Sequence, residues 1–144
     1  MKTEKNGNVY LHLSDFGLAK NTKPDYDRGT STVGNIKGTV EYLAPEILEG
    51  SKKKPNISKQ DVWAIGVIAY KLCTLRLPFA CESPGATIAA ILSKPHDPIP
   101  HKLYSDELKD LINLLLTKNP DQRPSIQELI NFPIIRNALE TLIR

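Results

Sequence analysis

The fold of this chain is decided by the stretch SKQDVWAIGVIAY at residues 58–70. It opens with Ser58, a predicted helix N-cap, and the acidic Asp61 follows three positions later. Residues 62–70 are apolar on every side of the expected helix, and such a helix is stable when it is buried all round. We therefore predict that this helix is the central post of the domain.

Helical patterns continue toward the C-terminus. Apolar residues recur at helical spacing over 108–115, directly after the Ser-Asp-Glu sequence at 105–107. The Ser-Ile-Gln-Glu sequence at 125–128 has the pattern of a capping box and predicts the start of another helix. Pro133 is expected to end that helix, and residues 134–143 can form a last short one.

The N-terminal part has a different character. Residues 1–17 are predicted to be β structure and residues 18–56 to be loop, whereas 57–144 are predicted to be helical. The Asn-Gly pair at 6–7 is a hairpin-turn signal, and 9–13 has strand composition. Only five residues precede this turn, so the first strand of the hairpin is nearly absent. The sequence thus predicts a mainly α fold with a remnant N-terminal β hairpin.

Composition excludes several classes of protein. The chain has 144 residues, 40% of them hydrophobic, which is typical of one globular domain and excludes a disordered or collagenous chain. Its net charge of +3 is too small to indicate nucleic-acid binding, and a solvated loop is the favoured interpretation of the basic run at 52–54. We therefore expect no nucleic-acid partner.

The cysteines and the hydropathy of the chain indicate the cellular compartment of the protein. Cys73 and Cys81 have neither metal-ligand nor redox spacing, and two thiols do not suggest a secreted disulfide framework. The longest charge-free run in the candidate central helix is far shorter than the ~20 apolar residues of a membrane span, and the N-terminus lacks a signal-peptide core. We expect an intracellular, cytoplasmic protein without membrane attachment.

Four motifs follow one another along the chain. They are Asp-Phe-Gly at 15–17, the sequence GTVEYLAPE at 38–46, DVWAIG at 61–66 and NPDQRP at 119–124. Together they resemble the C-terminal lobe of a eukaryotic protein kinase over residues 9–135. Further matches around 72–79 and 98–105 resemble the NIMA-related serine/threonine kinases, and this resemblance implies microtubule, centrosome or ciliary partners.

The resemblance implies a cofactor site at the first motif. Asp15 directly follows the predicted strand, and its carboxylate is a hard oxygen ligand suited to a Mg²⁺ ion that bridges nucleotide phosphates. Gly17 permits a sharp backbone turn after Phe16. Without the other motifs, an ordinary turn would be the simpler interpretation. The family's cofactors are ATP and Mg²⁺, with Asp15, Phe16 and Gly17 as the expected cofactor-binding residues and Asp15 as the metal ligand.

Residues 15–46 resemble an activation segment, which orders on phosphorylation and admits the protein substrate. Thr30, Ser31 and Thr32 are candidate phosphosites, although hydroxyl side chains are also simply common in loops. Many relatives carry the regulatory hydroxyl four residues before Thr39, and Asn35 stands there in this chain.

Three residues of the second motif are expected to form the substrate pocket. Thr39 matches the threonine typical of serine/threonine-specific kinases, and Gly38 and Tyr42 would shape the pocket with it. Lys71 stands where kinases that prefer basic substrates often have a glutamate, so no strong demand for arginine two residues before the phosphoacceptor is expected.

The remaining motif residues are expected to be structural. The resemblance implies a buried ion pair between Glu46 and Arg123, and loss of one partner would cost about 3 to 5 kcal/mol. Asp61, Trp63 and Gly66 are expected to hold the helical region together.

Several parts of a kinase have no match in these 144 residues. No Gly-rich loop, no Val-Ala-Ile-Lys sequence and no His-Arg-Asp catalytic loop is found, so we expect no catalytic aspartate and no N-terminal lobe here. The chain is interpreted as a partial kinase domain over 1–144, with the hairpin and Asp-Phe-Gly in 1–17, the activation segment in 15–46 and a helical subdomain in 57–144. Alone it should be inactive, because positioning of the reactants requires the missing groups.

Two interpretations stay open. The chain is either a fragment of an active serine/threonine kinase, whose partners are a protein substrate and the missing N-terminal half, or a short pseudokinase-like interaction module. A helical scaffold unrelated to kinases is a third interpretation.

Overall fold

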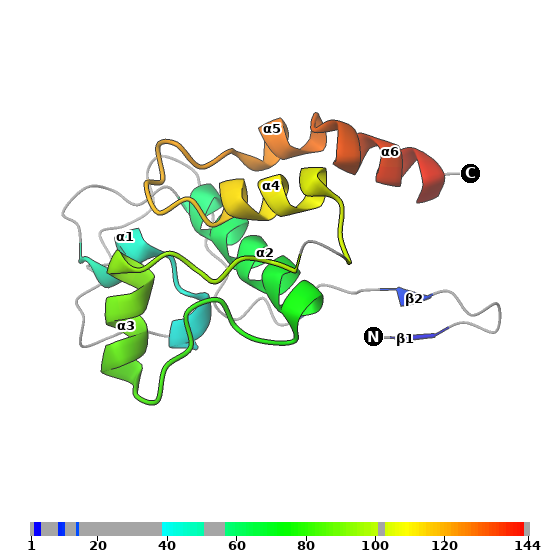
Figure 1. Cartoon of the computed structure of the whole chain (residues 1–144). Coiled ribbons are helices and arrows are strands. Elements are labelled where there is room, and N and C mark those ends of the chain that lie inside the picture. Colours follow the sequence, from blue (N-terminus) through cyan, green and yellow to red (C-terminus); the bar gives the residue numbers. More distant parts are fainter. Residues whose placement is uncertain are drawn as a thin grey trace.

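A computed structural model of the chain describes residues 2–3, 9–10, 14, 39–50, 57–100 and 103–142. This part is mainly helical (Figure 1). Its elements, in order, are β1 (Lys2–Thr3), β2 (Val9–Tyr10), the 3-10 helix η3 (Val40–Tyr42), α1 (Pro45–Leu48), α2 (Ile57–Thr74), α3 (Pro84–Ser93), α4 (Asp106–Leu115), α5 (Ile126–Ile130) and α6 (Pro133–Leu142). None of the described helices is long and apolar enough to cross a membrane.

Helix α2 runs through the middle of the helical body, with α4 and α5 along one side and η3 along another (Figure 1). Trp63, Val67 and Tyr70 belong to the larger hydrophobic cluster, which also takes in η3, α1, α3 and part of α4. Val62 turns the other way, into a second cluster with Leu111, Leu115 and Leu129. The predicted central role of this helix is therefore confirmed.

The prediction that α2 is buried on every side is wrong. Ile65, Ile68 and Leu72 are 43%, 50% and 70% exposed. Their spacing of three and four residues brings them to one side of α2, and we call this set the α2 stripe. The described elements cover the other sides of the helix and leave the stripe in contact with solvent.

The predicted N-cap of this helix is also wrong. The helix begins at Ile57, so Ser58 lies inside its first turn. Long-range hydrogen bonds hold this turn: the Lys59 carbonyl accepts from Arg123 Nη1 at 2.7 Å, and Lys59 Nζ donates to the Arg123 carbonyl. Tertiary contacts thus stabilise the first turn of this helix.

The capping signals of the later helices are confirmed. Ser105 caps α4, and its hydroxyl accepts from the Leu108 N–H. Ser125 and Glu128 form the predicted capping box at the start of α5. Hydrogen bonds from Ser125 lower the pKa of Glu128, because they favour the charged carboxylate. Helix α5 stops at Ile130, and Pro133 opens α6 close to the predicted last helix.

The predicted loop over residues 18–56 needs a correction, because its last part contains η3 and α1. Pro45 occupies the first turn of α1, where the lack of an N–H costs nothing, and Ala44 and Leu48 are buried in the larger cluster. Burial therefore organises a segment whose composition indicated a loop.

Helix α3 was not singled out from the sequence. Its signal is Ser83 followed by Pro84: the Ser83 hydroxyl accepts from the Ala86 N–H at 3.2 Å, and the proline stands at the first helical position.

At the N-terminus, β1 and β2 pair in antiparallel register, with Lys2 opposite Tyr10 and Thr3 opposite Val9. The predicted turn at 6–7 and the strand residues 11–13 lie outside the described residues. The remnant hairpin as a whole therefore stays a prediction.

Gly66 allows α4 to approach α2 closely. A Cβ atom added at this position would lie 2.8 Å from Leu115 Cβ and 3.0 Å from Leu116 Cδ2. We expect Gly66→Ala to lower the free energy of unfolding by about 1 to 3 kcal/mol through overpacking. Thermal melts followed by circular dichroism measure this change.

Gly85→Ala in α3 is the matched control, because nothing lies within 4 Å of an added Cβ there. The control should be neutral or slightly stabilising. Equal stability of the two variants would contradict the close approach at Gly66.

Candidate functional site

The segment from Thr39 to Leu48 lies against α2 and α3 and carries two motif positions of the predicted substrate pocket. Thr39 is exposed and extended, and its carbonyl accepts from the Tyr42 N–H at 3.1 Å. The Leu43 N–H donates to the Val40 carbonyl at 3.1 Å and closes η3. Val40, Tyr42 and Leu43 pack against the larger cluster. The segment therefore presents Thr39 to solvent from a packed base.

Tyr42 is tied to α2 by a side-chain contact. Lys71 Nζ donates to Tyr42 Oη at 3.4 Å, and this hydrogen bond is exposed. It joins two residues that are 29 positions apart in the sequence. The contact places a cation beside the candidate substrate segment.

The ion pair expected between Glu46 and Arg123 is present. Arg123 Nη1 lies 2.9 Å from Glu46 Oε1, and Arg123 Nη2 lies 3.1 Å from Glu46 Oε2, so the pairing is bidentate. The two side chains are 0% and 10% exposed. The pair fastens α1 to the loop between α4 and α5.

The Arg123 guanidinium has further backbone partners. Its Nε donates to the Thr117 carbonyl at 2.9 Å, and Nη2 also donates to the Lys118 carbonyl at 3.2 Å. With the bond from Nη1 to the Lys59 carbonyl, all five N–H groups of the guanidinium have acceptors. One side chain thus joins α1, the first turn of α2 and the loop after α4.

Aromatic rings and cations pack beside this ion pair. Trp63 is fully buried and stacks on Phe79 with ring centroids 5.6 Å apart. The Arg123 guanidinium carbon lies 5.1 Å from the Trp63 ring centroid, and Lys118 Nζ lies 4.4 Å from that of Phe79. Among the buried side-chain N and O atoms of the described residues, the Trp63 indole nitrogen has no hydrogen-bond partner.

Lys118 and Lys59 also contribute hydrogen bonds to this site, although the motifs did not indicate them. Lys118 Nζ donates to the Ala90 carbonyl at 3.3 Å and to the Ile91 carbonyl, and so ties the end of α3 to the same loop. Burial lowers the pKa of Lys118, because desolvation disfavours the charged ammonium. The sequence shows Lys118 directly before the Asn-Pro motif, but its carbonyl partners in α3 are 27 and 28 residues away. The local sequence therefore does not identify them.

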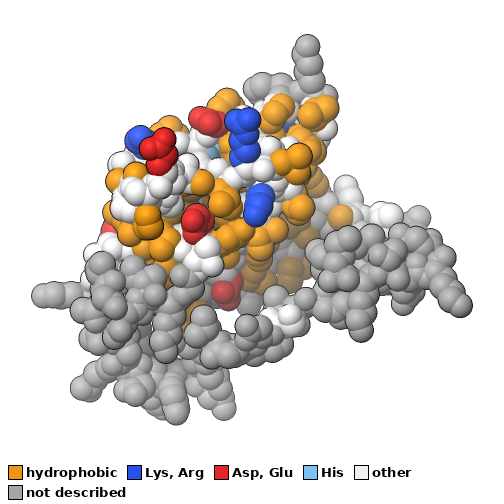
Figure 2. Space-filling view, turned by 90° about the horizontal axis from the view of Figure 1, so that it is seen from below, with side chains coloured by type: hydrophobic (Ala, Val, Ile, Leu, Met, Phe, Trp, Pro, Cys, Tyr) orange, Lys and Arg blue, Asp and Glu red, His pale blue; other side chains and the backbone are white. Residues whose placement is uncertain are grey.

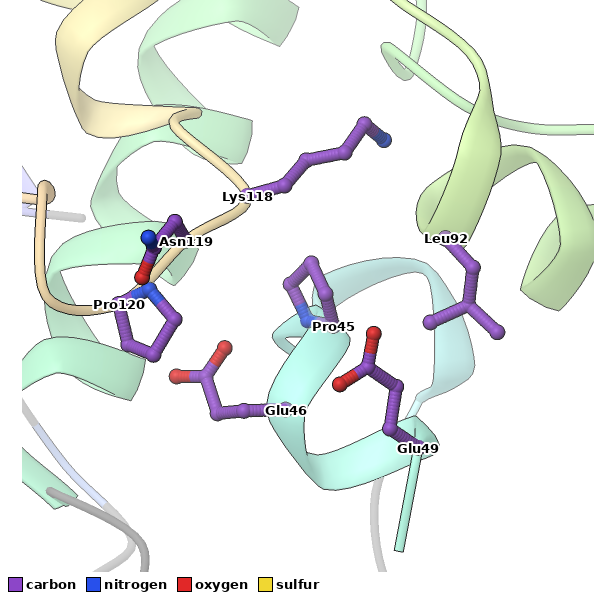
Figure 3. Close-up of a pocket in the computed structure, with 7 residues that line it drawn as sticks. All are labelled: Pro45, Glu46, Glu49, Leu92, Lys118, Asn119 and Pro120. Carbon is purple, nitrogen blue, oxygen red and sulfur yellow. The ribbon is translucent and has the colours of Figure 1, made fainter. Parts of the chain in front are cut away.

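A pocket of about 320 Å³ lies between α1, the end of α3 and the loop after α4. Figure 3 shows Glu46 and Glu49 on the α1 side and Lys118, Asn119 and Pro120 on the opposite side. Of the residues that line the pocket, Glu46 is paired with Arg123, and Lys118 donates to backbone carbonyls. Both charged side chains therefore already have structural partners. Glu46 is the predicted site residue that lines this pocket.

The other structural candidates are placed as follows. Trp63 and Gly66 are buried in the middle of α2, whereas Asp61 is exposed near the start of the helix. The candidate residues that lie outside the described part are Asp15, Phe16, Gly17, Thr30, Ser31, Thr32 and Gly38. Within the described part, no group of three His, Cys, Asp or Glu side chains could hold a metal ion.

Comparison with known proteins defines the family. A family model of the protein kinase domain matches residues 2–135, and the chain belongs to this family. It is 33% identical over 146 residues to the mouse serine/threonine-protein kinase Nek1, covering 96% of this chain and 11% of Nek1. It is 37% identical over 126 residues to the G2-specific protein kinase nimA of Emericella nidulans, covering 88% of this chain and 17% of nimA.

Human Nek10 is 37% identical over 117 residues, which cover 81% of this chain and 9% of Nek10. The resemblance to the NIMA-related serine/threonine kinases is therefore confirmed. The chain spans between 9% and 20% of the length of the curated relatives that it matches. Protein kinases are transferases that use ATP and Mg²⁺.

The Glu46–Arg123 pair supplies a test of the site's framework. Glu46→Gln keeps the shape of the side chain but leaves the buried guanidinium charge unpaired, so the free energy of unfolding should fall by about 3 to 5 kcal/mol. Urea unfolding followed by the fluorescence of Trp63, the single tryptophan, measures this change.

Glu49→Gln is the matched control, since Glu49 is an exposed carboxylate three residues along the same segment. Its effect should stay within about 0.5 kcal/mol. A loss at Glu46 no larger than the loss at Glu49 would show that the buried pair does not hold α1 in place.

Proposed function

We propose that this chain supplies the substrate-binding part of a serine/threonine protein kinase domain, which transfers the γ-phosphate of ATP to Ser or Thr of protein substrates. The observation that carries the proposal is the segment from Thr39 to Glu46. It is packed against α2, presents Thr39 to solvent and is anchored by the Glu46–Arg123 pair, in a chain of the protein kinase family. The proposed substrate is a protein, because an exposed segment of this kind can lie beside an extended peptide.

Gly38, Thr39 and Tyr42 are the proposed substrate pocket. Thr39 is exposed, and the Tyr42 hydroxyl accepts a hydrogen bond from Lys71. The two side chains lie three residues apart on one short segment. In this proposal they position the residue after the phosphoacceptor. The activation segment spans 15–46, with Thr30, Ser31 and Thr32 as its candidate phosphosites.

Asp15 is the proposed metal ligand, with Phe16 and Gly17 beside it in the nucleotide site. Bound Mg²⁺ would bridge the phosphates of ATP and neutralise the charge that develops on the transferred group. Asp15 would hold that ion through its carboxylate oxygens. The catalytic aspartate and the Gly-rich loop have no match in these 144 residues, so we propose that this sequence alone does not transfer phosphate.

The α2 stripe is the proposed contact surface for the segment that carries the catalytic loop and the ATP-binding lobe. Its side chains are up to 70% exposed, and exposed apolar surface of this kind marks an interaction site. Covering it would give α2 the all-round burial that its sequence favours. Protein substrate and this N-terminal half are thus the proposed partners.

A pseudokinase-like interaction module is the second candidate function. The same exposed stripe favours it, because an unoccupied apolar surface can bind another protein. Microtubule- or centrosome-associated proteins are the partners proposed in this case, on the resemblance to NIMA-related kinases. Phosphate transfer by a completed domain distinguishes the two functions.

The activity test uses the chain alone and a chimera in which the N-terminal half of the Nek1 kinase domain precedes it. Incorporation of labelled phosphate into a protein substrate should be absent for the chain and present for the chimera. Asp15→Asn in the chimera should reduce the rate by about 10²- to 10³-fold, because it removes a charge from the metal site.

Asp121→Asn is the control for this test, since Asp121 is an exposed carboxylate in the loop after α4. It should leave the rate of the chimera unchanged. A folded chimera without activity would favour the interaction module over the kinase.

The stripe has its own prediction. Leu72→Lys in the chimera should reduce activity, because a charge would be placed in the contact between the two halves and desolvated there. Leu103→Lys is the matched control, since Leu103 is 71% exposed and Leu72 is 70% exposed. Equal activity of the two variants would contradict the proposed contact.

A further inference from the structure

The chain between α3 and α4 contains the run Lys-Pro-His-Asp-Pro-Ile-Pro at residues 94–100, which we call the proline segment. It belongs to no helix or strand, and it leaves the end of α3 and crosses the helical body toward α4 (Figure 1). A proline ring fixes φ at about −65°, and the residue before a proline favours the extended or polyproline II region. Lys94 shows this, with φ −98° and ψ 144°. His96 is the one residue of the segment that is neither a proline nor followed by one, so the sequence favours polyproline II over its length.

The burial of the proline segment repeats every three residues. His96 is half-buried, and Ile99 is only 4% exposed, in the larger hydrophobic cluster. The remaining residues of the segment are all exposed, and they are Lys94, Pro95, Asp97, Pro98 and Pro100. A polyproline II helix has three residues per turn, so positions 96 and 99 lie along one edge of it. The segment therefore rests on the helical body by one edge and presents the other two to solvent.

Aromatic contacts hold the covered edge in place. The His96 ring meets the Tyr70 ring edge-on, with the ring centroids 5.1 Å apart, and its centroid lies 6.3 Å from that of Phe79. Ile99 belongs to the same hydrophobic cluster as Tyr70 and Phe79. His96 Nδ1 also lies 2.8 Å from the Asp97 carbonyl oxygen. Because the segment is already ordered by these contacts, a partner that binds it has little conformational entropy to remove.

The two exposed edges carry a PxxP motif. Pro95 and Pro98 are three positions apart and share one edge, while Lys94 and Asp97, the residues before them, share the other. Domains that recognise such a motif take two edges of the polyproline II helix into a groove lined by aromatic side chains and leave the third edge outside. In this chain, the third edge is the one that the protein itself covers. The motif is thus displayed with the two edges that such a groove requires.

The surroundings of the motif leave room for a partner. A hollow of about 670 Å³ is lined by Pro95 and Pro98 of the segment and by Asp110 and Asn113 of α4. Seen from below, the described surface shows isolated charged side chains among many hydrophobic ones, a class that includes proline in this view (Figure 2). Such a surface favours a partner that packs on apolar rings.

We propose that the proline segment is a docking motif for a protein domain with an aromatic-lined polyproline groove of the SH3 type, with Pro95 and Pro98 as its anchors. The two proline rings pack on aromatic side chains of the groove, and the exposed ammonium of Lys94 can lie over an aromatic face at its rim. The contact does not use Thr39, Tyr42 or the α2 stripe. It is therefore independent of the proposed kinase function and brings a partner to this chain without phosphate transfer.

Binding of the fluorescently labelled 144-residue chain to a panel of purified SH3 domains tests this proposal. The panel includes domains that bind PxxP ligands in either chain direction, and fluorescence anisotropy without ATP measures each affinity. We expect at least one domain to bind, and an unlabelled proline-rich peptide that occupies its groove to displace the chain. Pro95→Ala and Pro98→Ala should each weaken this binding about ten-fold, the loss expected for an anchor residue.

Pro84→Ala is the matched control. Pro84 is also an exposed proline, but it stands at the first position of α3 and outside the proline segment. Its replacement should leave the affinity unchanged. Circular dichroism of each variant verifies that the helices are retained, as we expect for replacements of exposed side chains.

Three results would overturn the proposal: no domain of the panel binds, the proline-rich peptide fails to displace the chain, or Pro84→Ala weakens binding as much as Pro98→Ala. Each of these can occur while the chimera remains an active kinase, since the binding assay involves no phosphate transfer. Conversely, binding that depends on Pro95 and Pro98 in a chain whose chimera is inactive would keep the docking motif and reject the kinase function.

Discussion

The Arg123 guanidinium is the interaction on which the rest of the structure depends. It pairs with Glu46 through two hydrogen bonds and donates its remaining N–H groups to the carbonyls of Lys59, Thr117 and Lys118. A buried charge of this kind is tolerated only when every donor is satisfied, so the surrounding backbone can adopt few other arrangements. Through it, the segment that carries Thr39 and Tyr42 has a fixed place relative to α2.

Helix α2 has two kinds of surface with different consequences. Trp63, Val67 and Tyr70 build the core, and Gly66 lets α4 come close. On the stripe, Ile68 and Leu72 are 50% and 70% exposed, and apolar area in water weakens the folded state relative to a covered one. The same helix thus stabilises this part of the chain and carries the exposed surface that we propose as the contact with the rest of a kinase domain. Lys71 directly precedes Leu72 in α2 and donates a hydrogen bond to Tyr42 of the candidate substrate segment.

Local signals predicted some elements well and others poorly. The Ser125 and Glu128 capping box and the Ser105 cap are formed within a few residues of chain, so sequence alone identified them. The predicted cap at Ser58 was wrong, and the first turn of α2 is instead bonded to Arg123, 64 residues beyond Lys59. For the site, the motifs indicated Glu46, Arg123 and Tyr42, whereas the cations Lys118 and Lys59 emerged only from contacts with distant carbonyls.

The sequence by itself determined the family, the mainly helical class and the position of the central helix, because motif spacing and apolar periodicity are local properties of the chain. The tertiary structure alone decided which side of that helix is covered. The sequence does not distinguish an apolar residue in water from one in a core: Ile65 and Val67 are both β-branched apolar residues of α2, but only Val67 is covered. It also decided that Lys71 meets Tyr42 and that Glu46 meets Arg123, since these contacts join residues 29 and 77 positions apart in the sequence.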